Sequence, residues 1–194
     1  MKTLPDLAQV KRRGCLQRGV PEADCESVAE HSHAVATYCL VSAPIWRTEA
    51  AEVALVHDLA EVVTGDVIPA DGINAEQKRS REELAFEYLE SVNPSITGLK
   101  AFLDDYRNKV IPAARLVHDV DKLQRLIRAA KYAQKYPHLD FGDFKEDVTA
   151  TTTPTCRLPD SALSTYEERE LTAGVPRWSW RRKRHPECLG RRET

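Results

Sequence analysis

At 194 residues, the chain is long enough for one well-buried domain and too short for two of ordinary size. Hydrophobic residues make up 42% and charged residues 30%, as in ordinary globular proteins, and the formal net charge of −2 argues against nucleic-acid binding by the whole surface. The longest apolar run, roughly residues 34–46, is shorter than the about 20 residues that span a bilayer, so no membrane segment is expected.

The cysteines indicate a reducing compartment. There are five, an odd number, and no pair has C-x-x-C spacing, so the sequence predicts neither a disulfide framework nor a thiolate zinc site. The N-terminus lacks an apolar stretch followed by a small-residue cleavage site. We therefore expect a cytoplasmic protein. Cys39, within "ATYCLVSA", is expected to be a small core residue.

Helices joined by short turns are expected first along the chain. One should begin near residues 26–27, where a cap is available, and stop at Pro44. The next should run over residues 48–64 and end at Gly65. Because no segment shows sustained alternation with a period of two, almost no β-sheet is expected. The later predicted helices cover residues 75–92, 99–110 and 113–136.

Two of the later helices have an expected apolar face. In the helix over 75–92, three residues are near helical spacing: Leu84, Tyr88 and Leu89. In the helix over 113–136 the predicted stripe is longer: Leu116, Val120, Leu123, Leu126, Ile127 and Ala130.

The helical pattern decays after these segments. We place the folded domain at residues 1–150, a loop with one further helix at 151–175 and a disordered tail at 176–194. The tail holds seven Lys/Arg and two Glu, a local charge of +5. Although Trp178 and Trp180 accompany these charges, a solvated tail is favoured over a contact with nucleic acid or a membrane.

The segment "VALVHDLAEVVTGD" places ionisable side chains in an apolar setting. His57 and Asp58 are adjacent, and Glu61 follows one helical turn later, so on one helix all three could face one pocket. Buried charges need compensation, and a metal ion would supply it. Imidazole and carboxylate suit Mn, Co, Fe or Zn, and less exclusively Mg. Other expected helices offer further ligands of the same kinds: His31, His33, Asp119 and Asp121.

Each of these residues also has a plainer interpretation. An H-D pair is common by chance, a single buried histidine is more often a satisfied core residue, and Asp121 could pair with Arg125 one turn later. The combination is rarer. A histidine, His31, is followed 26 residues later by His57-Asp58, and an aspartate, Asp121, comes 63 residues after Asp58. This order, in apolar helices, indicates a metal centre.

The order H…HD…D resembles the HD-domain phosphohydrolases, an all-helical, metal-dependent superfamily. Three stretches, "ESVAEHSHAVA", "ALVHDLAEVVTGDVIPAD" and "ARLVHDVDKLQRLIRAAKY", are similar to the 5′-deoxynucleotidase branch, and the resemblance covers roughly residues 10–150. The block "HDLAE…TGD…P" is its most specific part. The resemblance implies an all-α helical bundle with one central divalent ion (Co, Mn, Mg, Fe or Zn), a nucleotide substrate and a homodimer.

The resemblance also implies roles for individual residues. His31 is preferred to His33 because it follows Glu30, and Asp121 is preferred to Asp119 because "VDKL" matches the family's pattern. Glu61 would orient or deprotonate the attacking water, and Asp66 would lie near the leaving oxygen and sugar. The implied metal ligands are His31, His57, Asp58 and Asp121. The implied substrate contacts are Arg12, Arg13, Arg18, Thr64 and Lys122, the arginines being suited to phosphate by their planar fork.

One departure leaves the substrate open. Cys15 stands where the family's deoxynucleotidases typically have tryptophan, so stacking on the base and sugar selectivity are in question. The leading hypothesis is a phosphatase of 5′-(deoxy)nucleoside monophosphates. One alternative is a specialised phosphatase of a nucleoside-antibiotic pathway, acting on a 3′-phosphate or a triphosphate. Another is a non-catalytic helical module with a structural metal. A hydrolase of ppGpp or cyclic nucleotides fits the local stretches less well.

Overall fold

The computed structural model describes residues 6–42, 46–95 and 98–142. The chain divides into two units, Met1–Leu158 and Pro159–Thr194, and every described residue belongs to the first. The predictions for residues 151–175 and 176–194 lie outside the described residues, so the predicted domain boundary stays a prediction. In the described part, no helix combines the length and the apolar character needed to cross a membrane.

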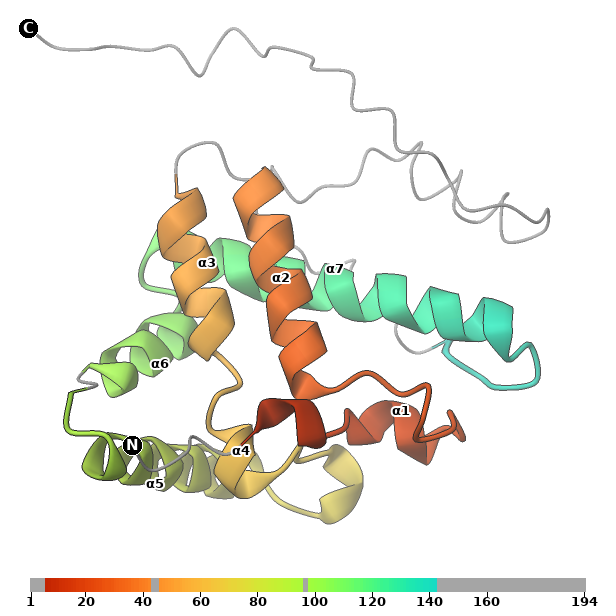
Figure 1. Cartoon of the computed structure of the whole chain (residues 1–194), viewed down its shortest axis with the longest axis horizontal. Coiled ribbons are helices and arrows are strands. Elements are labelled where there is room, and N and C mark those ends of the chain that lie inside the picture. Colours follow the sequence, from red (N-terminus) through yellow and green to blue (C-terminus); the bar gives the residue numbers. More distant parts are fainter. Residues whose placement is uncertain (1–5, 43–45, 96–97, 143–194) are drawn as a thin grey trace, which may run out of the picture. The chain divides into compact units, whose positions relative to one another are not determined.

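The described residues form an all-helical fold, as predicted (Figure 1). Lys11 and Ser27 form an isolated β-bridge. The described residues contain no β-strand. Two single 3₁₀ turns cover Leu7–Gln9 and Pro69–Asp71. The helices are α1 (Arg13–Gln17), α2 (Val28–Ser42), α3 (Arg47–Val56), α4 (Glu61–Thr64), α5 (Ala75–Val92), α6 (Leu99–Asn108) and α7 (Pro112–Lys135).

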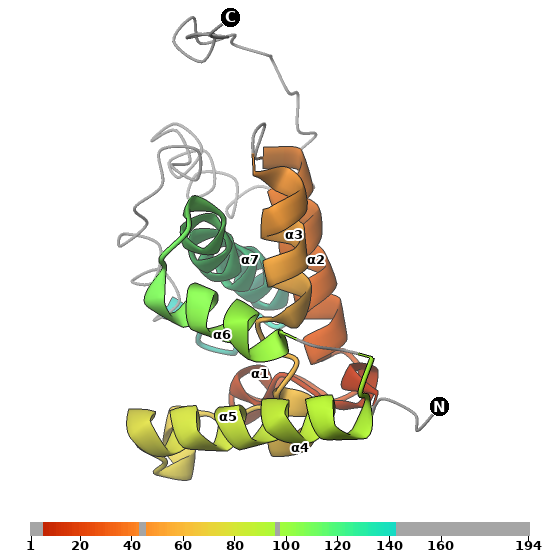
Figure 2. The same cartoon turned by 90° about the vertical axis from the view of Figure 1, so that its left-hand side faces the viewer.

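Helices α2, α3 and α7 enclose the main core. α2 and α3 lie side by side, and both pack on α7 (Figures 1 and 2). Small side chains at the contacts allow the helix axes to approach closely, and Cys39 is fully buried among them as predicted. The shared core includes Val35, Ala50, Ala54, Leu116, Val117 and Val120.

The start of α2 is fixed by a capping box, in agreement with the predicted cap. The Ser27 side chain accepts a hydrogen bond from the Glu30 backbone N–H at 3.1 Å, and the Glu30 carboxylate accepts one from the Ser27 backbone N–H at 2.7 Å. The first turn of α2 is therefore well defined. This turn is followed directly by His31.

The prediction of one helix over residues 48–64 is wrong. α3 ends at Val56, α4 begins at Glu61, and the four residues between them form turns. The His57 Nδ1 atom donates to the carbonyl oxygen of Ala54 at 2.6 Å, and an unbroken helix would give that carbonyl to the backbone N–H of Asp58. Because the side chain takes the acceptor, the helix stops where the ionisable residues begin.

The predicted face of α5 is also wrong in part. Leu89 is fully buried, but Leu84 is 62% exposed and Tyr88 52% exposed. The buried face instead contains Ala85 and Phe86, which pack with Leu89 against α6. Leu84 and Tyr88 each lie two positions from Phe86, about 160° away around the helix.

In α7, the predicted stripe is buried only in places. Leu116, Val120 and Ala130 are buried, whereas the intervening Leu123, Leu126 and Ile127 are half-buried. Two polar residues of α7, Asp119 and Gln124, are buried instead.

Candidate metal centre

Two histidines and an aspartate converge where α2, α3 and the turn after α3 meet. His31, His57 and Asp58 offer ligand atoms that all lie within 4.8 Å of one another. The distance from Asp58 Oδ2 is 3.2 Å to His57 Nε2 and 3.6 Å to His31 Nε2. The sequence therefore brings three of the four expected ligands into one group.

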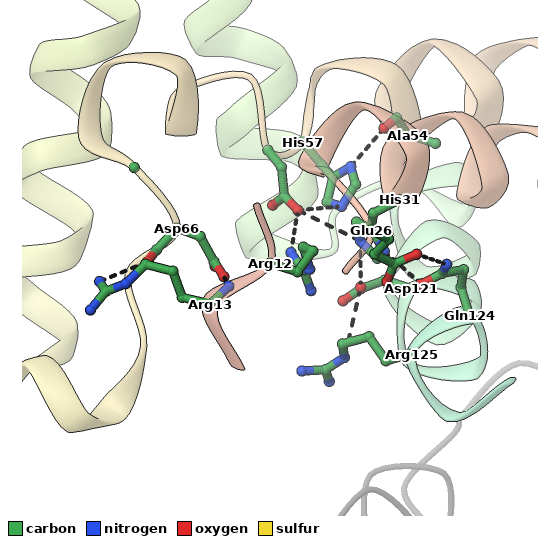
Figure 3. Close-up of polar contacts among 12 residues, drawn as sticks. Arg12, Arg13, Glu26, His31, Ala54, His57, Asp66, Asp121, Gln124 and Arg125 are labelled. Carbon is green, nitrogen blue, oxygen red and sulfur yellow. Dashed lines mark hydrogen bonds and ion pairs between the residues drawn. The ribbon is translucent and has the colours of Figure 1, made fainter. Parts of the chain in front are cut away.

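Asp121 joins this group from α7. Its Oδ1 atom lies 3.1 Å from His31 Nε2 (Figure 3). Arg125, one turn further along α7, approaches the same oxygen through its Nε atom at 3.8 Å. By contrast His33, the rejected neighbour of His31, is exposed. The structure thus gathers the four residues that the sequence favoured, from three separate parts of the chain.

The hydrogen bonds of the two imidazoles define which nitrogen faces the centre. His57 Nδ1 bonds to the Ala54 carbonyl and His31 Nδ1 bonds to Gln124 Oε1, each at 2.6 Å. Both partners are acceptors, so each Nδ1 carries a proton, and it is Nε2 that presents a lone pair when the imidazole is neutral. Neither Nε2 atom makes a hydrogen bond within the described part of the chain, although both are buried.

This arrangement fits a divalent metal ion. Imidazole lone pairs and carboxylate oxygens face one another at 3.1 to 3.6 Å, and such an arrangement needs a proton or a cation to be stable. The second hydrogen bond of each imidazole, made through Nδ1, is the kind of outer contact that orients histidine ligands in metal sites. A donor set of two nitrogens and two carboxylates suits the transition metals.

A buried polar chain supports His31 from behind. Glu26, only 3% exposed, accepts from Gln124 Nε2 at 3.0 Å and from Arg128 Nε at 2.7 Å. The bond to Glu26 fixes the orientation of the Gln124 amide, which then presents Oε1 to His31. Sequence reasoning missed Glu26 and Gln124 in this role. A polar residue three positions after Asp121, one helical turn along the same face, was the available signal.

Arg12 is held against the centre by the segment before α2. Its backbone N–H donates to the Glu26 carbonyl at 3.0 Å, and the Cys25 thiol donates to its carbonyl at 3.3 Å. The guanidinium Nη1 then lies 3.1 Å from Asp58 Oδ2. The Arg12 guanidinium thus borders the group of ligands, on the side away from Gln124 (Figure 3).

A cavity of about 570 Å³ opens beside the centre. Its wall includes His57, Asp58, Glu61, Asp66 and Asp121. Of the expected substrate contacts, Arg12 and Arg18 line it, whereas Arg13, Thr64 and Lys122 do not.

Arg13 makes contacts within the protein, to Asp66 and Asp71. Its guanidinium makes two 2.7 Å bonds to the Asp71 carboxylate and a 3.1 Å bond to the Asp66 carbonyl. Its backbone N–H donates to Asp66 Oδ2 at 2.5 Å. These bonds tie the start of α1 to the loop after α4, and they hold the Asp66 carboxylate at the cavity wall. Thr64 Oγ1 donates to the carbonyls of Ala60 and Gly65.

Comparison with known proteins identifies the family. The HD-domain family profile matches residues 4–157. The chain belongs to the HD-domain family. Two relatives are similar: the 5′-deoxynucleotidase YBR242W of Saccharomyces cerevisiae, 33% identical over 143 residues, and the 5′-deoxynucleotidase HDDC2 of Danio rerio, 30% identical over 140 residues.

The likeness covers 69% of this HD-domain chain in both cases, but 59% of the yeast relative and 68% of the fish relative. The chain thus spans less than two thirds of the yeast protein's length. Among solved structures, the PH0347 protein of Pyrococcus horikoshii OT3 superposes with a TM-score of 0.67 at 26% identity, over 84% of this chain and 93% of that protein.

The ionisable groups at the centre of this HD domain fall into two classes, those whose pKa is lowered and those whose pKa is raised. Burial alone would raise the pKa of Asp58, but His57, Arg12 and His31 together hold it far below its usual range. Asp121 behaves alike, because the close approach and charge of the His31 imidazole outweigh burial and lower its pKa. Both carboxylates are therefore charged at neutral pH and available to a cation.

The pKa values of His57 and Glu61 are raised instead. Burial would lower the pKa of His57, but Asp58 and Asp121 raise it to about 8. Glu61 is 4% exposed, its Oε2 has no hydrogen-bond partner among the described residues, and burial with the charges of Asp58 and Asp66 raises its pKa to about 10. Without a metal, protons therefore offset the negative charge of this cluster.

We expect the metal-free protein to lose stability as the pH rises from 6 to 9. Between pH 4.5 and about 10 the folded protein keeps a proton on Glu61 that the unfolded chain releases, and His57 does the same between 6.5 and about 8. Because the native state binds more protons in this window, the free energy of unfolding falls as the pH rises. Melting temperatures of the metal-free protein measure the effect.

The matched pair of variants is Glu61→Gln and Glu87→Gln, the second at an exposed position of α5. Glu61→Gln should flatten the fall in melting temperature and Glu87→Gln should leave it unchanged. A melting temperature that rises between pH 6 and 9 would contradict the assigned shifts. Asp58 and Asp121 do not disturb this test. A carboxylate whose pKa is lowered by folding loses its contribution to stability only at acidic pH, below the range from 6 to 9.

Several cavity residues were not found from the sequence. Arg125 and Arg128 follow Asp121 by four and seven positions, and this spacing on one helix was a usable signal. Lys78 and Arg107 come from α5 and α6, and no local pattern marks them. Tyr106 also lines the cavity, with its ring centroid 5.2 Å from that of His57 in an edge contact.

Proposed function

We propose that this HD domain is a metal-dependent phosphatase of nucleoside 5′-monophosphates, in line with the leading hypothesis from the sequence. One observation carries the proposal: two buried imidazole Nε2 atoms without hydrogen-bond partners in the described residues converge with Asp58 and Asp121 at the wall of a cavity. Two similar proteins, YBR242W and HDDC2, are named 5′-deoxynucleotidases, which supports the same substrate class.

The proposed ligands are His31 and His57 through Nε2, and Asp58 and Asp121 through their carboxylates. A bound divalent ion would lower the pKa of water toward neutrality and offset negative charge on a phosphate oxygen. Since borderline nitrogen and hard oxygen donors are both present, Mn, Co, Fe, Zn and Mg are all candidates.

Glu61 is the proposed proton acceptor. It begins α4, one short turn after Asp58, and its buried Oε2 has no protein partner in the described part of the chain. Asp58 is one source of its raised pKa, so compensation of the Asp58 charge lowers the pKa of Glu61 and frees it to accept a proton. Glu61 can then take the proton of the attacking water.

Arg12 and Asp66 have complementary proposed roles. Arg12 already donates Nη1 to Asp58, and its remaining N–H groups are available to phosphate oxygens. Asp66 is 8% exposed at the cavity wall and would lie near the leaving oxygen. In the reaction, a bond forms between the water oxygen and phosphorus, the bond to the nucleoside oxygen breaks, and that oxygen takes up a proton. The products are a nucleoside and inorganic phosphate.

A phosphate-release assay tests the function. The metal-stripped protein would be supplied with Co, Mn, Mg or Zn and offered 5′-dNMPs, 5′-NMPs, 3′-AMP and dATP in parallel. We expect metal-dependent release from 5′-monophosphates. Preference for 3′-AMP or dATP would overturn this in favour of the specialised phosphatase, and no release with any metal would favour the non-catalytic module.

We also propose that the protein acts in the cytoplasm as a homodimer. Cys15 and Cys25 are thiols outside any disulfide in the structure, which fits a reducing compartment. Large apolar side chains, including Val41 and Leu84, are exposed on the described surface and could be covered by a second copy. Light scattering after size-exclusion chromatography tests the assembly, and a single monomeric species would contradict the dimer.

A further inference from the structure

Glu26 is a buried carboxylate at the cavity wall that the proposed reaction does not use. Its side chain is only 2% exposed, and it is among the residues that line the cavity. The Glu26 carbonyl accepts the backbone N–H of Arg12 at 3.0 Å, and the Glu26 carboxylate accepts from Gln124 of α7 (Figure 3). Glu26 therefore lies between the proposed phosphate-binding arginine and the support of His31, outside the set of proposed metal ligands.

The protein uses one oxygen of this carboxylate. Gln124 Nε2, at 3.0 Å, and Arg128 Nε, at 2.7 Å, both contact Glu26 Oε2. Within the described part of the chain, no hydrogen bond reaches Glu26 Oε1. A carboxylate can accept about four hydrogen bonds, and a buried oxygen that lacks donors lowers the stability of the folded protein. A hydrogen-bond donor from outside the protein is therefore expected at Oε1.

The parts of a nucleotide differ in what they offer to a carboxylate oxygen. The phosphate is negatively charged and is already assigned to the metal site and Arg12. The sugar follows the phosphate directly, and its hydroxyl groups are hydrogen-bond donors. The base is attached beyond the sugar. Because only the Gln124 amide separates the Glu26 carboxylate from the proposed metal ligand His31, the sugar is the part of the substrate that comes opposite Glu26.

We propose that Glu26 Oε1 accepts a hydrogen bond from the 3′-hydroxyl group of the sugar, and that Glu26 thereby selects substrates in which this hydroxyl is free. The inference rests on the proposed function, which supplies the site of the phosphate. The 3′-hydroxyl is the one that ribonucleoside and 2′-deoxyribonucleoside 5′-monophosphates share, so one contact serves the whole proposed substrate class. A 3′-phosphate in the same place would bring two negative charges together, which is unfavourable.

Steady-state kinetics on the metal-loaded protein test the proposal with a pair of substrates. dAMP and 2′,3′-dideoxyadenosine 5′-monophosphate (ddAMP) differ only in the 3′-hydroxyl group. We expect kcat/KM to be about tenfold higher for dAMP than for ddAMP, the effect of one hydrogen bond to a charged group. A wild-type protein that turns over ddAMP as well as dAMP would overturn the proposal.

Variants then assign the preference to Glu26. Because the acceptor is removed, Glu26→Ala should lower the ratio of kcat/KM for dAMP to that for ddAMP from about ten to about one. The variant also releases Gln124, so both rates should fall, but a role through Gln124 and His31 alone would leave the ratio unchanged. Glu22→Ala, at an exposed position before α2, is the matched control and should keep the wild-type ratio. A wild-type ratio in Glu26→Ala would contradict the proposal.

A binding measurement separates this proposal from the proposed function. Calorimetry on metal-loaded Glu61→Gln, with dAMP and ddAMP as probes, needs neither turnover nor a stable Glu26 variant. Binding of dAMP that is about tenfold tighter than that of ddAMP would support the contact even if no phosphate were released by the wild-type protein. Equal binding of the two probes would overturn it even if dAMP were a good substrate.

Discussion

Replacing Asp58 by asparagine is expected to abolish metal binding and phosphate release together. Asp58 Oδ2 lies within 3.6 Å of the Nε2 atoms of both His31 and His57, so it is the carboxylate that the two imidazoles share. The amide keeps the shape but removes the charge that attracts a cation. We expect metal affinity to fall by more than about 100-fold, beyond the effect of removing an outer contact of a ligand.

Metal content and affinity, measured by elemental analysis and calorimetry, would be compared with phosphate release from dAMP. Asp104→Asn on α6 provides a control, because it removes a carboxylate that does not line the cavity. If Asp58→Asn kept one metal ion per chain at unchanged affinity, Asp58 would not be a ligand. In that case the close contact between Asp58 and Arg12 would be a structural ion pair.

The sequence could predict that the metal-centre residues lie together, because each of them is subject to the same local energetic constraint. An ionisable side chain in an apolar helix is costly unless something compensates it, and His31, His57, Asp58 and Asp121 all had that character. The choice between His31 and His33 depended on the resemblance and agrees with burial, since His31 is fully buried and His33 is exposed.

The break after α3 could not be read from the apolar pattern. Apolar residues continue on both sides of His57, so periodicity favoured one helix. The break depends on a single hydrogen bond from the His57 side chain to the Ala54 carbonyl, which competes with the backbone. This turn aims Asp58 at the centre and lets α4 place Glu61 beside it, so the feature that the prediction missed is the one that positions the site.

The cations of the cavity were beyond sequence reasoning for another reason. Lys78 and Arg107 belong to α5 and α6, and their place depends on how these helices pack around Phe86 and Leu103. Because each arginine or lysine on a helix is most often solvated, its presence alone carries little information. Only the packing of five helices, α1 and α4 to α7, around this cavity shows which of these cations line it.

Replacing Glu61 by glutamine is expected to remove turnover and leave metal binding in place. The amide preserves size and burial but cannot accept the proton of the attacking water. A loss of about 10² to 10⁴ in kcat follows from the usual contribution of a general base. Metal affinity should change little, because Glu61 is not one of the four proposed ligands. Calorimetry and phosphate release on the same preparation measure both quantities.

The exposed Glu87→Gln variant controls for the loss of a carboxylate, and it should match the wild-type protein in both measurements. Full activity in Glu61→Gln would show that another group accepts the proton. The remaining candidate in the described cavity wall is Asp66, the other buried carboxylate outside the ligand set and the Glu26 chain. Its Oδ2 already accepts a hydrogen bond from the Arg13 backbone N–H at 2.5 Å, so this oxygen is engaged within the protein.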